Sequence, residues 1–273
     1  MIKCNNWPIG VCVWSLDNDL DKIGRLRQET NLTHINLGLW PAIDGKDENF
    51  LARVKKEQWD INATVINFPQ EDYSTLDSIK ATGGIVMDKY WDVNSQRVFK
   101  ALDITAEMGV KYLLFHFGFF DHTDAKAAQG FKDKVKRLAD AAAKKHIALL
   151  METGQETADD LKLLLEELKH PALFVNLDPG NMILYNKGNP VEAVKTLQPW
   201  IRQVHAKDAL RTKVAGTWGQ EMPWGDGEVG TDAFLKALKQ EGFEGVLAIE
   251  REAGGNKYED IKLGVGRLSH WNA

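Results

Sequence analysis

The chain has 273 residues, with 34 lysines and arginines against 39 aspartates and glutamates, a net charge of −5 and no block of like charges, which argues against bulk attraction to nucleic acid. The hydrophobic fraction of 44% and charged fraction of 27% are those of a globular protein, and no apolar run approaches the roughly 20 residues of a membrane span. Two cysteines, Cys4 and Cys12, and an N-terminus without a signal-peptide core lead us to expect a cytoplasmic protein with neither a nucleic-acid nor a membrane partner.

Short apolar runs alternate along the chain with segments of helical periodicity. The apolar runs predict strands at residues 9–16, 33–40, 61–68, 110–117, 147–153, 172–178, 201–208 and 245–250. The periodic segments predict helices at residues 19–31, 48–60, 93–108, 125–146, 157–169, 189–198, 231–241 and 260–271. The stretch 70–90 is the least regular and contains Gly83 and Gly84, so we expect it to form a lid over an active site.

This alternation predicts an α/β protein with a single (β/α)8 TIM barrel. The chain is close to the roughly 250 residues typical of that closed fold. No G-x-G-x-x-G fingerprint follows the first strand, which removes the main argument for a Rossmann domain. Because no linker or low-complexity tract divides the chain, we predict one domain over residues 1–273. Functional residues of such a barrel lie where the strands end.

Four side chains suited to metal binding stand at the ends of four consecutive predicted strands. They are Glu152 in ALLMETGQE, Asp178 in VNLDPGN, His205 in QVHAKD and Glu250 in LAIERE. Each alone has a structural explanation, such as a helix cap or a core histidine. Together they would place three carboxylates in mutual repulsion without a cation. We therefore predict a site for one divalent ion, with Mn²⁺ as first choice and Mg²⁺, Co²⁺ or Zn²⁺ as alternatives.

Other residues are candidates for substrate contact. His116 ends the fourth predicted strand, and Lys207 shares the face of His205 by strand alternation, although an ion pair with a neighbouring acid is the alternative for Lys207. Tryptophans at strand ends, and in the loop after the seventh strand, offer flat faces to a sugar, with plain packing as the alternative. These tryptophans are Trp14, Trp40, Trp218 and Trp224.

These motifs resemble the xylose-isomerase-like TIM barrels, which include sugar phosphate isomerases/epimerases and ketose 3-epimerases. The resemblance covers the whole barrel and is strongest from Glu152 to Glu250, and the run WGQEMPWGDGEVGTDAFLKAL from Trp218 is similar to the family's loop before strand eight. It implies that Glu152, Asp178, His205 and Glu250 bind one ion. It also implies that the two glutamates are catalytic and flank the sugar carbon from opposite faces.

The resemblance implies further substrate contacts. Glu156 and Arg211 occupy places comparable to those of a Glu and an Arg that grip the sugar. The family commonly has a histidine three residues after the strand-six aspartate, where this chain has Asn181. An amide hydrogen-bonds a hydroxyl but does not titrate near pH 7, so this departure weakens the case for simple ketose 3-epimerase activity.

The first functional hypothesis is a metal-dependent sugar isomerase/epimerase that abstracts a proton next to a carbonyl and forms an enediolate. The alternative is a lyase or dehydratase acting on an oxidised sugar or glycoside, because the same abstraction can precede loss of a β-substituent. An endonuclease IV-like DNA repair enzyme ranks lower, since Asn67 and Asn181 stand where its additional metal ligands would be. A non-catalytic sugar-binding barrel is disfavoured by the presence of both glutamates. We expect a small sugar or polyol as partner, and a homo-oligomer remains open.

Overall fold

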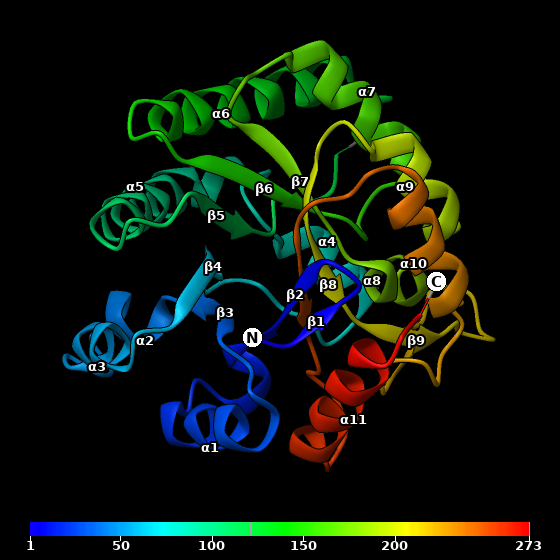
Figure 1. The fold of residues 1–273 in the computed structure, drawn as a ribbon. Helices are drawn as coiled ribbons and strands as arrows, with labels where there is room; N and C mark the ends of the chain where they lie inside the picture. Colours follow the sequence, from blue (N-terminus) through cyan, green and yellow to red (C-terminus); the bar gives the residue numbers. More distant parts are fainter. Residues whose placement is uncertain (121, 273) are drawn as a thin grey trace.

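The computed structural model, which describes residues 1–120 and 122–272, shows a closed barrel of parallel strands inside a ring of helices (Figure 1). The strands follow the order β2-β11-β8-β7-β6-β5-β4-β3, and a β2–β3 pairing closes the barrel. They are β2 (Trp7–Cys12), β3 (His34–Gly38), β4 (Asp60–Val65), β5 (Tyr112–Phe115), β6 (Ala148–Glu152), β7 (Leu173–Leu177), β8 (Ile201–Ala206) and β11 (Val246–Ile249). The predicted (β/α)8 TIM barrel is confirmed.

Each predicted helix has a counterpart outside the barrel. These helices are α1 (Leu20–Thr30), α3 (Phe50–Glu57), α5 (Trp91–Glu107), α6 (Ala125–Ala143), α7 (Ala158–Leu168), α9 (Pro190–Leu197), α10 (Thr231–Gln240) and α11 (Lys257–Ser269). The last helix begins three residues before its predicted start at Asp260. Shorter elements are β1 (Lys3–Cys4), η1 (Val13–Leu16), α2 (Trp40–Ile43), α4 (Leu76–Thr82), η2 (Asp88–Tyr90), α8 (Pro179–Leu184), β9 (Asp208–Leu210) and β10 (Gln220–Met222). None of the helices in the described ranges is long and apolar enough to cross a membrane.

Capping residues set where the helices begin after the strands of the site. Thr157 accepts the backbone N–H of Asp160, whose carboxylate in turn accepts the N–H of Thr157, so a capping box starts α7. Asp178 caps α8 by accepting the N–H of Asn181 at 2.8 Å, and Pro179 takes the first helical position. The turn from β7 into α8 therefore fixes Asp178 at the end of the barrel.

The barrel interior below the site is polar. Asn36, Asn176, Gln203 and His205 are fully buried there, among strands whose other residues are mostly apolar. Gln203 Nε2 donates to Asn176 Oδ1 at 3.1 Å, and Asn62 donates to Gln203 Oε1. Because buried amides are costly unless they are hydrogen-bonded, this layer is held in a defined geometry.

The glycine-rich loop after β10 is explained by Asp208. Its carboxylate accepts the backbone N–H groups of Gly225, Gly227 and Val229 at 2.9 to 3.1 Å. A Cβ atom at Gly227 would lie 2.2 Å from Asp208 Oδ1, so only glycine fits at this position. The G-x-G-x-V run thus wraps a buried carboxylate and has a structural role.

The irregular stretch 70–90 docks against the end of β5. Ile85 donates its N–H to the Phe117 carbonyl at 3.0 Å, and Gly84 adopts a φ of +68° with its α-carbon packed on the Phe117 backbone. Two residues of this stretch, Glu71 and Tyr73, line a cavity of about 640 Å³, the main cavity of the structure. The segment therefore forms part of the wall of this cavity, and its role as a lid stays a prediction.

Candidate metal centre and active site

The structure brings together the four side chains that the sequence singles out, which we call the donor set: Glu152, Asp178, His205 and Glu250. One potential ligand atom from each lies within 4.8 Å of the others. Glu152 ends β6, His205 lies near the end of β8, and the other two follow β7 and β11 directly. Since parallel strands of a barrel end on the same face, four short apolar runs suffice to assemble the group.

The donor set contains two buried atoms that make no hydrogen bond to the described residues. His205 Nδ1 lies 2.8 Å from Glu152 Oε1, 3.4 Å from Glu250 Oε2 and 3.9 Å from Asp178 Oδ2. His205 Nδ1 and Asp178 Oδ2 are buried and make no hydrogen bond to the described residues. Such atoms are costly unless something satisfies them. A divalent cation between them would do so, and the residues present fit such an ion.

Burial shapes the charge of Asp178. Its side chain is fully buried, and burial together with the nearby charges of Glu250 and Glu152 raises its pKa well above the ordinary value of an aspartate. A cation would favour the ionised carboxylate and so compete with the proton. The metal affinity of this site should therefore depend on pH.

The interior amides set the orientation of His205. Its Nε2 atom lies 3.0 Å from Asn36 Nδ2 and 3.1 Å from Gln203 Nε2. For Nδ1 to bind a metal, the ring proton must be on Nε2, where the Asn36 oxygen would accept it if that amide turned over, whereas Gln203 is held by its bonds to Asn176 and Asn62. Sequence reasoning missed these amides, although alternation places Gln203 on the same side as His205.

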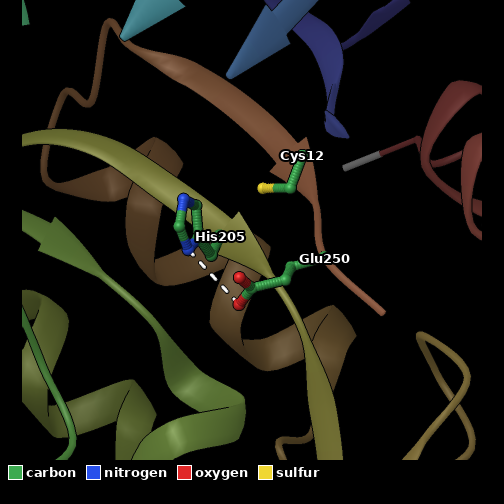
Figure 2. Close-up of side chains that lie close together, drawn as sticks. All are labelled: Cys12, His205 and Glu250. Atoms are coloured by element: carbon green, nitrogen blue, oxygen red, sulfur yellow. Dashed lines mark ion pairs between the residues drawn. The ribbon is translucent and has the colours of Figure 1, made fainter. Parts of the chain in front are cut away.

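A second combination, Cys12 with His205 and Glu250, also places its donor atoms within 4.8 Å. Figure 2 shows the Cys12 sulfur and the Glu250 carboxylate close to the His205 ring. Burial raises the pKa of the Cys12 thiol to about 12, so the sulfur is protonated near neutral pH. Because the thiolate is the form that binds metals, the oxygen-rich donor set is the better site.

The two glutamates have different surroundings. Glu250 accepts the Trp14 indole N–H through Oε1 at 2.6 Å and the Lys207 ammonium through Oε2 at 3.0 Å. Glu152 Oε1 lies 2.8 Å from His205 Nδ1 and accepts the Asn176 amide at 3.1 Å, and no residue in the described ranges donates to its Oε2. Its side chain is also 15% exposed, against 5% for Glu250. Glu250 is thus held at both oxygens, and Glu152 keeps one oxygen free.

Lys207 is held by three carboxylates. Its Nζ atom lies 2.6 Å from Glu252, 3.0 Å from Glu250 and 3.9 Å from Glu221. Burial alone would lower the pKa of Lys207, but Glu250 and Glu252 raise it well above its ordinary value. Lys207 is therefore an ammonium ion, and the expected alternative of an ion pair with neighbouring acids describes its contacts.

A cavity of about 640 Å³ opens above the donor set. One wall carries Trp14 and Trp40, with ring centroids 6.0 Å apart, and another carries Tyr185 and Trp218, 4.8 Å apart. Trp224 does not line the cavity and packs against Phe234. Sites of this size with aromatic walls and a few polar groups are typical of small-molecule binding.

Four predicted substrate-binding residues line this cavity: Trp14, His116, Asn181 and Lys207. His116 also contacts Glu71, and Asn181 is mostly buried at the start of α8. Asn67, named in the nuclease hypothesis, lines the cavity as well. The sequence therefore located part of the cavity wall.

Arg211 does not lie where the resemblance implies. Its guanidinium donates to Asn186 Oδ1 at 2.9 Å and to the Gly188 carbonyl at 2.7 Å, and it does not line the cavity. The chain enters the β9–β10 hairpin just before Arg211, which carries the side chain toward the loop after α8. Its position does not support the prediction that Arg211 grips the substrate, which stays untested.

Glu156 is also displaced from the main cavity. It lines a separate, small cavity with apolar neighbours such as Phe131 and Leu161, and burial raises its pKa to about 8. Gln155, which the sequence did not single out, lines the main cavity instead. The prediction that Glu156 contacts the substrate is therefore not supported by its position.

Sequence reasoning missed several other residues of the main cavity. They are Glu71, Tyr73, Tyr185, Glu221 and Glu252. Glu71 and Tyr73 belong to the irregular stretch, where no periodicity indicates which side chains face inward. For Glu252 a signal existed, because alternation places it on the same side as Glu250.

A parallel (β/α)8 barrel with three carboxylates and a histidine at the carboxyl ends of its strands defines the class of barrels equipped to bind a divalent ion. Residues 20–268 match the family model of the xylose isomerase-like TIM barrel, and the chain belongs to that family.

The individual proteins that resemble this chain have low sequence identity to it. A xylose isomerase domain protein from Planctomyces limnophilus is similar, with 28% identity, a TM-score of 0.87 and coverage of 97% of this chain and 96% of that one. A xylose isomerase-like barrel from Mycobacterium smegmatis, in complex with magnesium, has 18% identity and a TM-score of 0.72 over 98% and 97% of the two chains, which shows the fold alone. An inosose dehydratase from Clostridium botulinum is 25% identical over 134 residues, 43% of this chain, and the match spans only 45% of that relative's length.

Proposed function

We propose that this protein is a divalent-metal-dependent sugar isomerase or epimerase that removes a proton from the carbon next to a carbonyl and passes through a substrate enediolate. The free oxygen of Glu152 carries this proposal, because it faces the cavity beside the donor set without a hydrogen bond from the described residues. A carboxylate so placed can act as the general base. When bound, a divalent ion, with Mn²⁺ as our first choice, would stabilise the negative charge that develops on the substrate oxygens.

Glu250 is better placed to orient than to take a proton. Trp14 and Lys207 occupy its two oxygens, at 2.6 and 3.0 Å. Burial alone would raise the pKa of Glu250, but Lys207 and His205 hold it well below its ordinary value. A carboxylate with such a low proton affinity is a weak base. We therefore assign the abstraction to Glu152 and a ligand role to Glu250.

The cavity supports a small, unphosphorylated sugar or polyol. The rings of Trp14 and Trp218 offer surfaces for the apolar faces of a sugar. The two lysines that line the cavity are both paired, Lys207 with Glu250 and Lys257 with Asp17 at 3.3 Å. Neither is available as a free cation for a phosphate group.

Dehydration is a second candidate, and the unequal glutamates favour it. Epimerisation by two carboxylates needs a second base on the opposite face of the carbon, whereas elimination needs one base at the carbon and a proton for the departing oxygen. Of the two glutamates, only Glu152 has an oxygen to which no described residue donates, because Trp14 and Lys207 occupy both oxygens of Glu250. The partial similarity to an inosose dehydratase points in the same direction.

Deuterium exchange tests the proposal. The Mn²⁺-loaded protein is incubated in deuterium oxide with D-fructose and, separately, with an inosose, and the substrate and products are followed by NMR and mass spectrometry. We expect deuterium at the carbon next to the carbonyl, and loss of this exchange in Glu152→Gln measured at a Mn²⁺ concentration that saturates the variant. An epimer or isomer as product supports the first candidate, and a dehydrated product supports the second.

Two results would count against the proposal. Conversion of a probe without any deuterium uptake would indicate a hydride shift, which needs no base at the carbon. Exchange in Glu152→Gln at the wild-type rate would show that another group removes the proton. Circular dichroism and metal analysis of each variant separate these outcomes from misfolding or metal loss.

A further inference from the structure

His116 has a buried ring nitrogen that makes no hydrogen bond to the described residues. The residue follows β5 directly, is 6% exposed, and lines the main cavity. Its Nδ1 atom lies 3.2 Å from Glu71 Oε1, whereas its Nε2 atom is buried without a hydrogen bond to any described residue. Buried polar atoms normally have hydrogen-bond partners, so we expect Nε2 to have one that the described residues do not supply.

Glu71 determines which nitrogen carries the proton. Its Oε1 accepts the Gly84 N–H and its Oε2 accepts the Phe68 N–H, each at 3.0 Å. These bonds hold the carboxylate in place. A carboxylate only accepts, so Nδ1 of His116 must donate to it. In the neutral ring, the lone pair is then on Nε2.

The ring is also fixed by packing. A Cβ atom at Gly83 would lie 2.5 Å from His116 Cε1, so this glycine allows the segment 70–90 to pack closely against the ring. Phe119 contacts it edge-on with centroids 5.9 Å apart, and Tyr73 lies at 6.3 Å. A purely structural role for His116, holding the segment 70–90 in place, would explain the contact of Nδ1 with Glu71. It would not explain an unpartnered Nε2 on a residue of the cavity wall.

His116 and Glu152 stand on neighbouring strands. β5 and β6 pair in parallel with Phe115 opposite Met151, so His116 and Glu152 each follow a member of this pair. Both line the same cavity. Glu250, by contrast, follows β11, which β8 and β7 separate from β6 in the barrel.

We infer that His116 and Glu71 form a proton-transfer dyad, in which His116 exchanges a proton with a substrate oxygen while Glu152 exchanges one with the adjacent carbon. His116 is the catalytic residue, and Glu71 positions it. This inference rests on the proposed function and adds to it the group that handles the oxygen. It assigns the two proton transfers to neighbouring residues instead of to the two glutamates of the donor set.

The proton transfers balance without an oxidant. Glu152 takes the proton of the C–H next to the carbonyl, the electron pair of that bond forms the C=C of an enediol, and the carbonyl oxygen takes a proton from Nε2 of protonated His116. The hydroxyl on the deprotonated carbon then returns a proton to His116, and Glu152 delivers its proton to the former carbonyl carbon. If a β-hydroxyl takes the His116 proton instead, its C–O bond breaks and water leaves.

The test compares exchange with turnover in His116→Gln. With Mg²⁺-loaded protein, D-fructose and an inosose in deuterium oxide, we expect product formation to fall about 10²- to 10⁴-fold, while deuterium uptake at the carbon falls much less. His170→Gln is the matched control, because His170 pairs with Asp140 at 3.1 Å outside the cavity. Product formation at the wild-type rate, or an equal fall in both rates, would overturn the inference.

A spectroscopic measurement needs no substrate. In ¹⁵N spectra of the Mg²⁺-loaded protein, neutral His116 should show a protonated Nδ1 and a bare Nε2, and Glu71→Gln should change this tautomer. A bare Nδ1 in the wild type would overturn the dyad even if neither probe is converted. Absence of exchange with a confirmed tautomer would instead count against the proposed function, so the two failures are distinguishable.

Discussion

Replacing Asp178 by Asn separates the metal-binding role of this residue from its structural one. Asp178 Oδ1 accepts the Asn181 N–H at 2.8 Å, a bond that an asparagine oxygen can keep, and Oδ2 is buried without a hydrogen bond. The substitution removes a carboxylate whose pKa is raised by burial. We therefore expect the metal-free protein to lose less than about 1 kcal/mol of unfolding free energy.

The response to metal should differ sharply between the two proteins. At a free Mn²⁺ concentration of about 100 times the Kd, a bound ion adds about 2.7 kcal/mol to the unfolding free energy of the wild type. If Asp178→Asn weakens binding about 100-fold, the gain at the same concentration falls to about 0.4 kcal/mol. Urea unfolding with EDTA and with Mn²⁺ measures both gains. Equal gains would refute the assignment of Asp178 as a ligand.

Asp208→Asn is the matched control. Asp208 is also buried and lies three residues after His205, but its oxygens accept the N–H groups of Gly225, Gly227 and Val229. An amide nitrogen would face donors there, so we expect a loss of about 2–5 kcal/mol in the metal-free protein and an unchanged gain from Mn²⁺. If the two variants behaved alike, the distinction between a metal-binding and a structural aspartate would fail.

Three further substitutions test other contacts. Trp14→Phe removes the 2.6 Å bond to Glu250 and should weaken Mn²⁺ binding about tenfold in titration calorimetry, whereas an unchanged affinity would show that the indole does not support the site. Arg211→Ala should leave Mn²⁺ and probe-sugar affinities unchanged, because its guanidinium bonds lie in a loop outside the cavity, and a loss of sugar affinity would return Arg211 to the site. Burial raises the pKa of Glu156 to about 8, so the folded protein keeps a proton that the unfolded chain releases above about pH 4.5. The wild type should therefore lose stability relative to Glu156→Gln between about pH 4.5 and pH 8, and a constant difference in urea unfolding would contradict this.

The sequence predicted the parts of the structure that depend on local pattern. Every predicted strand overlaps a strand of the barrel because each is a compact apolar run, and every predicted helix has a counterpart. The donor set was predictable because its members stand at strand ends, where the fold itself brings them together. Alternation also placed Lys207 correctly on the cavity side.

Positions that depend on loops were not predictable in this way. Arg211 begins the loop between β9 and β10, whose pairing redirects the chain, and nothing in its local sequence indicates that turn. Glu71 comes from the irregular stretch, and its contact with His116 joins residues 45 positions apart. Gln155 and Glu156 are neighbours, and both line the small cavity, but only Gln155 also reaches the main cavity, a difference that local sequence pattern does not indicate.

Glu152 and Glu250 have different roles in the reaction that we propose, although they are the same residue type. The resemblance assigns them matching roles, but a carboxylate's proton affinity is set by the donors around it. Glu250 could take a proton only by giving up Trp14 or Lys207, and Lys207 is itself held by Glu252 at 2.6 Å. Glu152 has no such constraint on Oε2. In the reaction that we propose, a second proton-transfer group must therefore come from elsewhere in the cavity, and His116 has a ring nitrogen without a hydrogen-bond partner in the described chain.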